Sequence, residues 1–183
     1  VNFSIPNSKM LKYLNCMSNK LQDLDLLELK ELIHLDLAYN QINSIDLNEQ
    51  TNLLNLYCNY NPLSALDILK LSKLKVLNCN NTKIEILSIA NSKDLMQLDC
   101  SSTSLYALLL KNGANELPEL NISGNDFLKY ICCEDKHIEQ VNLILERIGK
   151  IDCNVNSYCS FNEGGKFYNV NGISKFNKDN LDC

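Results

Sequence analysis

Leucine and isoleucine recur along this chain at a fixed spacing, and the same short pattern is repeated six times. Residues 53–63 and 74–84 both follow L-x-x-L-x-C-x-x-N/T-x-L/I, and their leading leucines are 21 residues apart. A fixed period of this length indicates a repeat architecture, in which each repeat buries its apolar side chains only against its neighbours. We number the places of each repeat from its leading leucine, and the repeats begin at Leu11, Leu32, Leu53, Leu74, Leu95 and Leu117.

Places four and six of each repeat are apolar and alternate with polar residues, which predicts a short strand with one buried face. A second apolar triple at places 11, 14 and 16 predicts another extended segment on the opposite side. A 21-residue repeat leaves no room for a full helix, so we expect strand or 3₁₀ helix there. The pattern therefore predicts an α/β leucine-rich-repeat solenoid of about six coils, with a parallel sheet on its concave side and few helices. In repeat six the second triple is Phe127, Tyr130 and Cys132.

The chain divides into three parts. Residues 1–10 are expected to be an N-terminal remnant or partial cap, residues 11–133 the solenoid, and residues 134–183 a C-terminal cap. Apolar residues recur at helical spacing between residues 134 and 150, and Gly149 follows as a stop signal, so we predict a capping helix there. Residues 153–168 predict two short strands around Glu163-Gly164-Gly165, a hairpin turn signal. The apolar stripe of the predicted helix consists of Ile138, Val141, Ile144, Leu145 and Ile148.

Place nine is Asn in four repeats and Thr in Thr82 and Thr103. A buried Asn there is expected to bond the backbone of the turn, so that successive repeats form a ladder. Thr has fewer hydrogen-bonding groups, and we therefore expect repeats four and five to be looser.

The nine cysteines form two groups. Four of them occupy place six, where Leu37 and Ile122 stand in repeats two and six, so we interpret them as buried, inert thiols. The other five follow the last full motif. A zinc site among these five is the rival interpretation to disulfide bonds, and the lack of a C-x-x-C pair disfavours it. The first group is Cys16, Cys58, Cys79 and Cys100, and the second is Cys132, Cys133, Cys153, Cys159 and Cys183.

Composition narrows the classes of function. The net charge is −5 and no basic block occurs, which argues against nucleic acid or an anionic membrane as partner. No apolar run reaches the roughly 18 residues that a membrane span needs. The first residues resemble no signal peptide, but export would have removed one. Hydrolase, metalloprotease and phosphate-loop motifs are missing, so we expect no enzyme, no metal and no cofactor.

Recognition is expected on the outward places of the concave sheet. Tyrosine offers a large rigid surface with a polar tip, which is typical of recognition surfaces, and tyrosines gather in repeats one to three. His34 and Asp36 are two residues apart on one strand, but a solvated strand explains them without acid–base or metal chemistry. An exposed tyrosine also needs no binding role. The predicted ligand-binding residues are Tyr13, His34, Asp36, Tyr39, Tyr57 and Tyr60.

Two resemblances add to this interpretation. The repeats with Cys at place six resemble the cysteine-ladder repeats of the internalin J type. The tail, residues 128–132, 153–161 and 164–168, looks like the segment that closes the repeats in secreted Bacteroidetes (flavobacterial) leucine-rich-repeat surface proteins with type IX secretion. That resemblance implies export and a secreted or cell-surface location. It also implies disulfides in the tail, for which we expect Cys132–Cys153 and Cys159–Cys183, with Cys133 as the rival of Cys132.

The sequence thus predicts a monomeric, non-catalytic recognition or adhesion module of an exported bacterial protein. Its concave face is expected to bind a protein or a glycan. The alternative is a structural spacer that presents downstream domains and has no ligand of its own.

Overall fold

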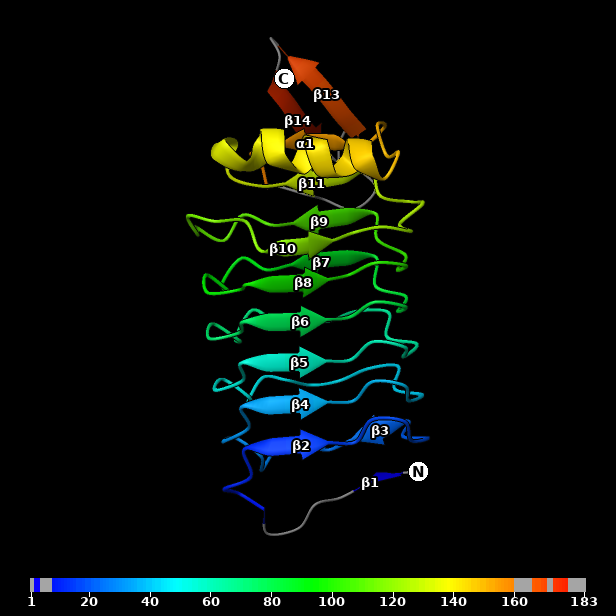
Figure 1. Cartoon of the computed structure of the whole chain (residues 1–183), viewed down its shortest axis with the longest axis vertical. Helices are drawn as coiled ribbons and strands as arrows, with labels where there is room; N and C mark the ends of the chain where they lie inside the picture. The colour runs from blue at the N-terminus through cyan, green and yellow to red at the C-terminus, as the bar shows by residue number, and fades with distance from the viewer. Residues whose placement is uncertain (1, 4–7, 160–165, 171–172, 178–183) are drawn as a thin grey trace.

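The computed structural model describes residues 2–3, 8–159, 166–170 and 173–177, with side chains for residues 8–159. The chain winds into a stack of coils whose strands run parallel to one another (Figure 1). One short strand per repeat builds a six-stranded parallel sheet along the stack. This confirms the leucine-rich-repeat solenoid with few helices. The strands are β2 (Tyr13–Asn15), β4 (His34–Asp36), β5 (Asn55–Tyr57), β6 (Val76–Asn78), β8 (Gln97–Asp99) and β10 (Glu119–Asn121).

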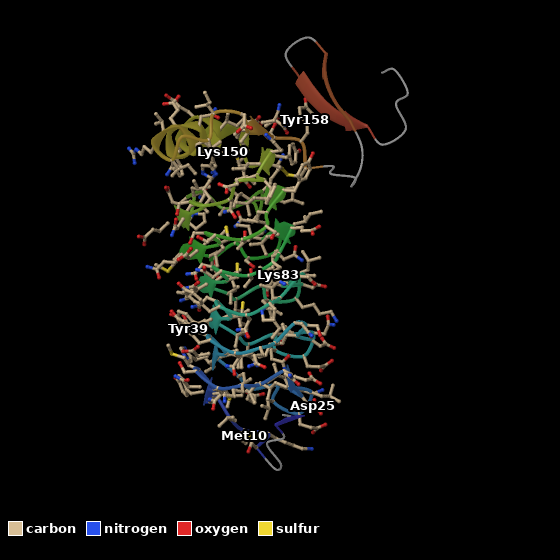
Figure 2. All side chains as sticks on the ribbon, turned by 90° about the vertical axis from the view of Figure 1, so that its right-hand side faces the viewer. Met10, Asp25, Tyr39, Lys83, Lys150 and Tyr158 are labelled. Carbon is tan, nitrogen blue, oxygen red and sulfur yellow. A yellow bond between two sulfur atoms is a disulfide. The ribbon has the colours of Figure 1, made fainter. Side chains whose placement is uncertain are left out.

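These strands follow from the pattern of each repeat. The middle residue of each strand is place four, and it points into the core, whereas places three and five point outward. Neighbouring strands pair place for place, as in Leu35 with Leu56 and Leu56 with Leu77. We call the outward side of this sheet, formed by places three and five, the front face. Figure 2 shows Tyr39 on the side of this sheet and Asp25 on the opposite side of the solenoid.

The opposite side carries a second, less regular set of strands. A four-stranded parallel sheet joins β7 (Ile86–Ser88), β9 (Ala107–Leu109), β11 (Tyr130–Cys132) and β12 (Asn154–Asn156). Near the N-terminus, β1 (Asn2–Phe3) pairs in parallel with β3 (Asp23–Leu24). Asn2 and its partner Asp23 are also 21 residues apart, which is the spacing between equivalent places of neighbouring repeats. β1 therefore pairs as the back strand of a coil before repeat one would. The predicted back segment is therefore strand in repeats one, four, five and six.

The core is one apolar cluster that runs the length of the stack. Place 19, which the pattern did not identify, is also buried in repeats one to four as Leu29, Gln50, Leu71 and Ser92. The polar members are satisfied across repeats: Gln50 donates to the Leu26 carbonyl at 2.8 Å, and Ser92 donates to the Leu71 carbonyl at 3.3 Å. Buried polar groups are tolerated when they are bonded in this way.

The place-nine ladder is confirmed. Asn61 donates to the carbonyls of Leu37, Cys58 and Asn59, and its Oδ1 accepts the Ile42 N–H at 3.0 Å. Asn40 makes the equivalent bonds one coil earlier. One side chain thus ties two coils together. Thr82 contributes a bond to the Cys79 carbonyl within its own coil, at 2.8 Å.

The cysteines at place six lie in the core, as expected. Cys58, Cys79 and Cys100 are almost completely buried, and burial raises the pKa of Cys58 to about 12. Burial also raises the pKa of Cys79, and the neighbouring Cys100 and Cys58 raise it further. Thiols with raised pKa values carry little thiolate at neutral pH and are unreactive. Their role here is packing.

The C-terminal helix also forms. A 3₁₀ turn, η1 (Asp135–His137), leads into α1 (Ile138–Arg147), which buries Val141 and Leu145. Ile148 lies at the C-terminal end of the helix and is exposed, so the predicted stripe is one residue too long. Because α1 connects the parallel strands β11 and β12, it serves as a crossover helix as well as a cover.

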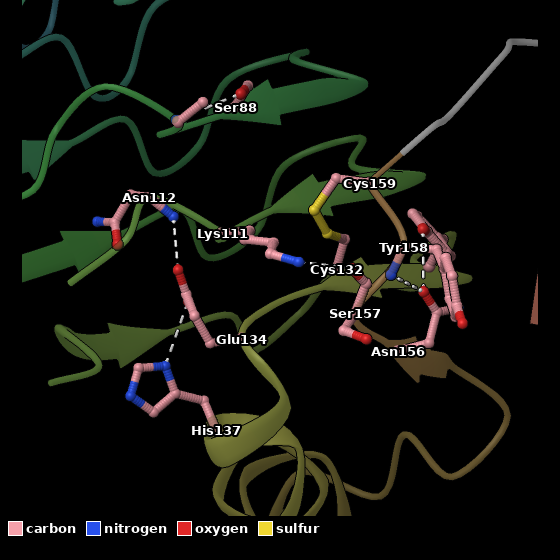
Figure 3. Close-up of a disulfide and its surroundings, with 12 residues drawn as sticks. Ser88, Lys111, Asn112, Cys132, Glu134, His137, Asn156, Ser157, Tyr158 and Cys159 are labelled. Atoms are coloured by element: carbon pink, nitrogen blue, oxygen red, sulfur yellow. Dashed lines mark hydrogen bonds and ion pairs between the residues drawn. A yellow bond between two sulfur atoms is a disulfide. The ribbon is translucent and has the colours of Figure 1, made fainter. Parts of the chain in front are cut away.

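Glu134 anchors this cap to the preceding coil (Figure 3). Its Oε1 accepts the backbone N–H groups of Asn112 and Gly113 at 3.0 and 2.6 Å, and its Oε2 lies 3.4 Å from Nδ1 of the buried His137. Burial raises the pKa of Glu134, but the backbone N–H groups outweigh this effect, so that the pKa lies below its ordinary value. The carboxylate is therefore held in its charged form.

Two sequence predictions in this region were wrong. Phe127 was expected to face inward, but it is 68% exposed, and Leu128 is buried instead. The reason is that repeat six is longer than 21 residues. A fixed count of 21 therefore places the inward positions of its second half one residue too early in the chain. The second wrong prediction concerns the hairpin. β12 pairs in parallel with β11, while the antiparallel pair is β13 (Lys166–Val170) with β14 (Ile173–Asn177). The proposed turn at residues 163–165 lies outside the described residues.

Candidate functional site

The front face carries a row of aromatic rings across three neighbouring strands. The ring centroid of His34 on β4 lies 6.4 Å from that of Tyr13 on β2 and 5.5 Å from that of Tyr57 on β5. Tyr13 is 68% exposed, and the other two rings are half-buried. The structure therefore brings three of the six predicted binding residues into one continuous group.

Tyr39 and Tyr60 form a second aromatic group at the ends of strands β4 and β5. Their rings stack with centroids 4.2 Å apart and an interplanar angle of 9°. Both residues occupy place eight, where the chain turns with positive φ values of 56° and 54°. Desolvation of the phenol raises the pKa of Tyr39, and the adjacent Tyr60 raises it further. The stacked pair remains partly accessible, with nearly half of each side chain exposed.

Asp36 has a structural role. Its Oδ1 accepts the backbone N–H of Ala38 at 3.0 Å and so holds the turn that follows the strand. In five of the six repeats an Asn or Asp at place five accepts the same bond from the backbone N–H two residues later. Such local side-chain bonds stabilise turns. The Asp36 carboxylate is therefore used to hold the turn.

Tyr57 is the exception in this column. It occupies place five, where the other repeats have Asn15, Asp36, Asn78, Asp99 and Asn121. A tyrosine has no acceptor that can reach the turn N–H in this way. Repeat three therefore lacks a structural hydrogen bond that its neighbours make, and presents an aromatic ring to solvent instead. The ring is half-buried and packs against that of His34, with the ring centroids 5.5 Å apart.

A shallow depression of about 310 Å³ begins at Tyr57 and extends over β6, β8 and β10. The polar residues of this lining occupy outward places of the repeats, so the sequence contains the signal for them. The prediction instead followed the tyrosines, which are concentrated in repeats one to three. Asp99 accepts the Ser101 N–H and hydroxyl through Oδ1, and Asn80 Nδ2 through Oδ2. Glu119 accepts Gln97 Nε2 at 3.1 Å. The polar residues of the lining are Tyr57, Asn78, Gln97, Asp99, Glu119 and Asn121.

A larger hollow of about 540 Å³ lies on the back, between repeats one and two. Its carboxylates are used within the structure: Asp25 and Asp46 accept the N–H groups of Leu27 and Asn48, and Glu49 pairs with Lys30 at 2.7 Å. No aromatic side chain lines it. The front face is therefore the better candidate for recognition.

The described part of the tail contains a disulfide, but its pairing differs from the one expected. Cys132 is bonded to Cys159, with the two Cα atoms 5.3 Å apart (Figure 3). Cys153 and Cys133 are free thiols, and burial raises their pKa values to about 12 and about 11. The predicted Cys132–Cys153 bond and the predicted partner of Cys159 are therefore wrong. Cys183 lies outside the described residues.

The cause of this pairing is the parallel contact between β11 and β12. Cys132 lies opposite Asn156 at the end of that pair, and the chain continues from there to Cys159. Lys111 donates to the Ser157 carbonyl at 3.0 Å and Asn156 accepts the Tyr158 N–H at 2.8 Å, so the segment before Cys159 is held against the stack. Cys153 precedes β12 and lies at its other end.

Within the part of the chain that the structure describes, no group of three or more His, Cys, Asp or Glu side chains is arranged to hold a metal ion. Among these same residues, no helix is long and apolar enough to cross a membrane.

No family model and no curated protein matches this chain. Among solved structures, it is similar to the functional domain of InlJ from Listeria monocytogenes, which includes a cysteine ladder. The TM-score is 0.50 and the identity 26%, over 67% of this chain and 34% of that one. It is also similar in fold to a leucine-rich-repeat protein of Leptospira interrogans, with a TM-score of 0.55 and 24% identity over 80% of this chain and 37% of that one. The chain thus spans about a third of the length of each. The expected likeness to cysteine-ladder repeats is confirmed.

Proposed function

We propose that this chain is a non-catalytic recognition or adhesion module that binds a protein or a glycan through its front face, the concave side expected of a leucine-rich-repeat sheet. The observation that carries the proposal is Tyr57. At a place where the other five repeats keep a turn-holding Asn or Asp, repeat three has a half-buried ring that completes a row with His34 and Tyr13. Rigid aromatic rings bury area on binding at a small entropic cost, which suits a recognition surface.

The face also has the size and shape for recognition of an extended ligand. The aromatic row covers β2, β4 and β5, and the depression beside Tyr57 continues to β10. All six strands therefore contribute to one surface. Its polar groups are held by neighbouring side chains and turns, as Asp99 is by Asn80 and Ser101. Groups fixed before binding lose little freedom when a ligand arrives.

We further propose that the module works outside the cell, as a monomer, with residues 134–183 closing the end of the solenoid. The Cys132–Cys159 disulfide supports this location, since disulfides form and persist in oxidising compartments. The resemblance of the tail to exported Bacteroidetes proteins points the same way, and type IX secretion is part of this proposal. Residues 1–10 would then belong to the N-terminal side of the same stack.

A structural spacer is the second candidate. It is favoured by the bonds that hold the front-face residues themselves: Asp36 and its counterparts stabilise turns, and a spacer needs nothing more. The two candidates differ in what they predict for Tyr57, because recognition uses the face of this ring, whereas a spacer needs no ring at a place that holds a turn in the other repeats.

A binding screen with a matched variant separates them. The purified chain is tested on a glycan array and on an array of host and matrix glycoproteins, beside Tyr57→Asn and Tyr57→Phe. Asn is the residue of this column in repeats one, four and six, so Tyr57→Asn is expected to fold and to keep the turn. A hit that Tyr57→Asn loses and Tyr57→Phe keeps supports the front face. A hit that survives Tyr57→Asn contradicts it, and no hit at all favours the spacer.

A further inference from the structure

The front face has an unusual distribution of charge. The chain has 17 Lys and Arg residues, yet none of them occurs at places three, five, seven or eight in any repeat. Three acidic residues do occur there: Asp36 on β4, Asp99 on β8 and Glu119 on β10. The face is therefore acidic, and it lacks the basic residues that cover the other sides of the solenoid.

These carboxylates are not neutralised by ion pairs. Among residues 8–159 the ion pairs involve Glu28, Glu49, Asp152 and Glu134, all away from the front face. The partners of Asp99 and Glu119 are uncharged donors: Asn80, Ser101 and Gln97. Neutral donors orient a carboxylate without cancelling its charge. The negative charge of the front face is thus available to a ligand.

The aromatic row adds a second reason to expect a cation. The face of a tyrosine ring attracts an ammonium or guanidinium group. Tyr57 belongs both to this row and to the lining of the acidic depression, so rings and carboxylates meet at one residue. A neutral sugar uses the rings but leaves the carboxylate charges unmatched, and an acidic glycan is repelled by them.

From this charge and geometry we infer that the front face binds an extended, lysine- or arginine-bearing segment of a partner protein, lying across the strands along the axis of the stack. Six strands at a spacing of about 4.8 Å give a surface about 24 Å long. An extended peptide covers this length with about seven residues. The inference rests on the proposed function and names the chemistry of its partner.

The test measures binding of a fluorescent heptalysine peptide by anisotropy, with the same peptide in acetyl-lysine form as the uncharged control. The parent chain is expected to bind heptalysine, and binding should weaken as salt increases, because the attraction is between exposed charges. Asp99→Asn with Glu119→Gln should weaken binding at least tenfold. Asn already occupies place five in Asn78 and Asn121, so this variant keeps the turn-holding bond.

A matched control removes the same two charges elsewhere. Glu31→Gln with Glu139→Gln changes two exposed carboxylates outside the front face, and its affinity should stay within about twofold of the parent. Tyr57→Asn should weaken binding, and Tyr57→Phe should preserve it, since phenylalanine keeps the ring face.

Three results overturn the inference: no binding of heptalysine, equal binding of the acetylated peptide, or equal weakening by the two charge-removing variants, which would show only a net-charge effect. A neutral or acidic ligand that the parent binds and Tyr57→Asn loses would also overturn it, while leaving the proposed function intact. The proposed function itself would be contradicted only if Tyr57→Asn weakened the binding of no ligand, whether basic, neutral or acidic.

Discussion

Tyr39 and Tyr60 stack face to face although both have the left-handed backbone conformation, with φ values of 56° and 54°. The same place eight has positive φ in Ser18, Asn81 and Ser102, and in repeat six it is Gly124. The turn after each strand therefore imposes this conformation on whatever residue stands there. For residues other than glycine it costs on the order of 1 kcal/mol.

This relationship predicts how Tyr60 responds to substitution. Tyr60→Asn loses the stacked ring but gains a residue that tolerates the left-handed region, as Asn81 does in the next repeat, so we expect a change in unfolding free energy within about 1 kcal/mol. Tyr60→Val also loses the ring, and a β-branched residue is strained there, so it should be less stable than Tyr60→Asn by about 1–2 kcal/mol. Chemical denaturation of both variants gives the comparison. Equal stabilities would contradict the prediction.

The ladder at place nine predicts a loss and a gain of stability. Asn61→Ala removes a buried side chain with four backbone bonds and leaves buried groups unpaired, so we expect a loss of about 3 kcal/mol. Thr82→Asn restores the missing step between repeats three and four, and we expect a gain of about 1 kcal/mol.

Thermal unfolding of both ladder variants is compared with that of Asn91→Ala, whose exposed side chain makes a single bond to the Leu69 carbonyl. That control should lose less than about 1 kcal/mol. A ladder variant Asn61→Ala that behaves like this control would mean that the ladder is not a source of stability.

The Cys132–Cys159 disulfide closes a loop with a sequence separation of 27. A cross-link of this span contributes about 3–4 kcal/mol in the chain-entropy model. Cys159→Ser should lower the unfolding free energy by about this amount, and a reducing agent should destabilise the parent but not the variant. Peptide mapping without reduction should recover Cys132 linked to Cys159.

Cys153→Ser serves as the control for that experiment. Cys153 is a free thiol, so its replacement should leave the mapped disulfide unchanged. Recovery of a peptide linking Cys132 to Cys153 from the parent would contradict the structure and return to the pairing that the sequence resemblance implied.

Glu134 predicts an acid-sensitive cap. Because its pKa in the folded protein lies below the ordinary value of 4.5, its charge stabilises the fold above the unfolded-state pKa. This contribution disappears as the pH falls through the lower, folded-state pKa. Glu134→Gln should therefore be less stable than the parent at neutral pH, and the difference should shrink from about pH 5 downward.

Thermal unfolding between about pH 7 and about pH 3 measures this difference. The variant Glu139→Gln removes an exposed carboxylate of the same helix and should follow the parent across the range. A gap between Glu134→Gln and the parent that stays constant with pH would show that the charge of Glu134 is not what anchors the cap.

The sequence predicted much of the fold because its signals were local and repeated. Each of the six front strands contains place four, and the Asn ladder and the cysteine column follow the same count. The signal failed where the period changed. Phe127 is exposed because repeat six is longer, and a fixed count has no means of placing the extra residue.

The tail shows the same limit for pairing. Cys153 and Cys159 both follow the helix, and nothing in their spacing states which of them lies beside Cys132. Similarly, the Glu163-Gly164-Gly165 signal predicts the hairpin too early in the chain, because Asn171-Gly172, a stronger hairpin signal, stands in the sequence between β13 and β14. The strand before the first signal instead pairs with β11 across a helix.

By itself, then, the sequence determined the solenoid, its period and its buried columns. It also determined the outward columns, which contain Tyr13, His34, Tyr57 and the acidic residues. A 21-residue pattern can be identified in this way because it depends only on residues that are close together in the chain. Only the tertiary structure decided which outward residues come together. The row from Tyr13 to Tyr57, the stack of Tyr39 on Tyr60 and the bond from Cys132 to Cys159 join residues 21 or more positions apart. Such contacts depend on how coils and segments align in space, and that alignment is set by the packing of the whole core.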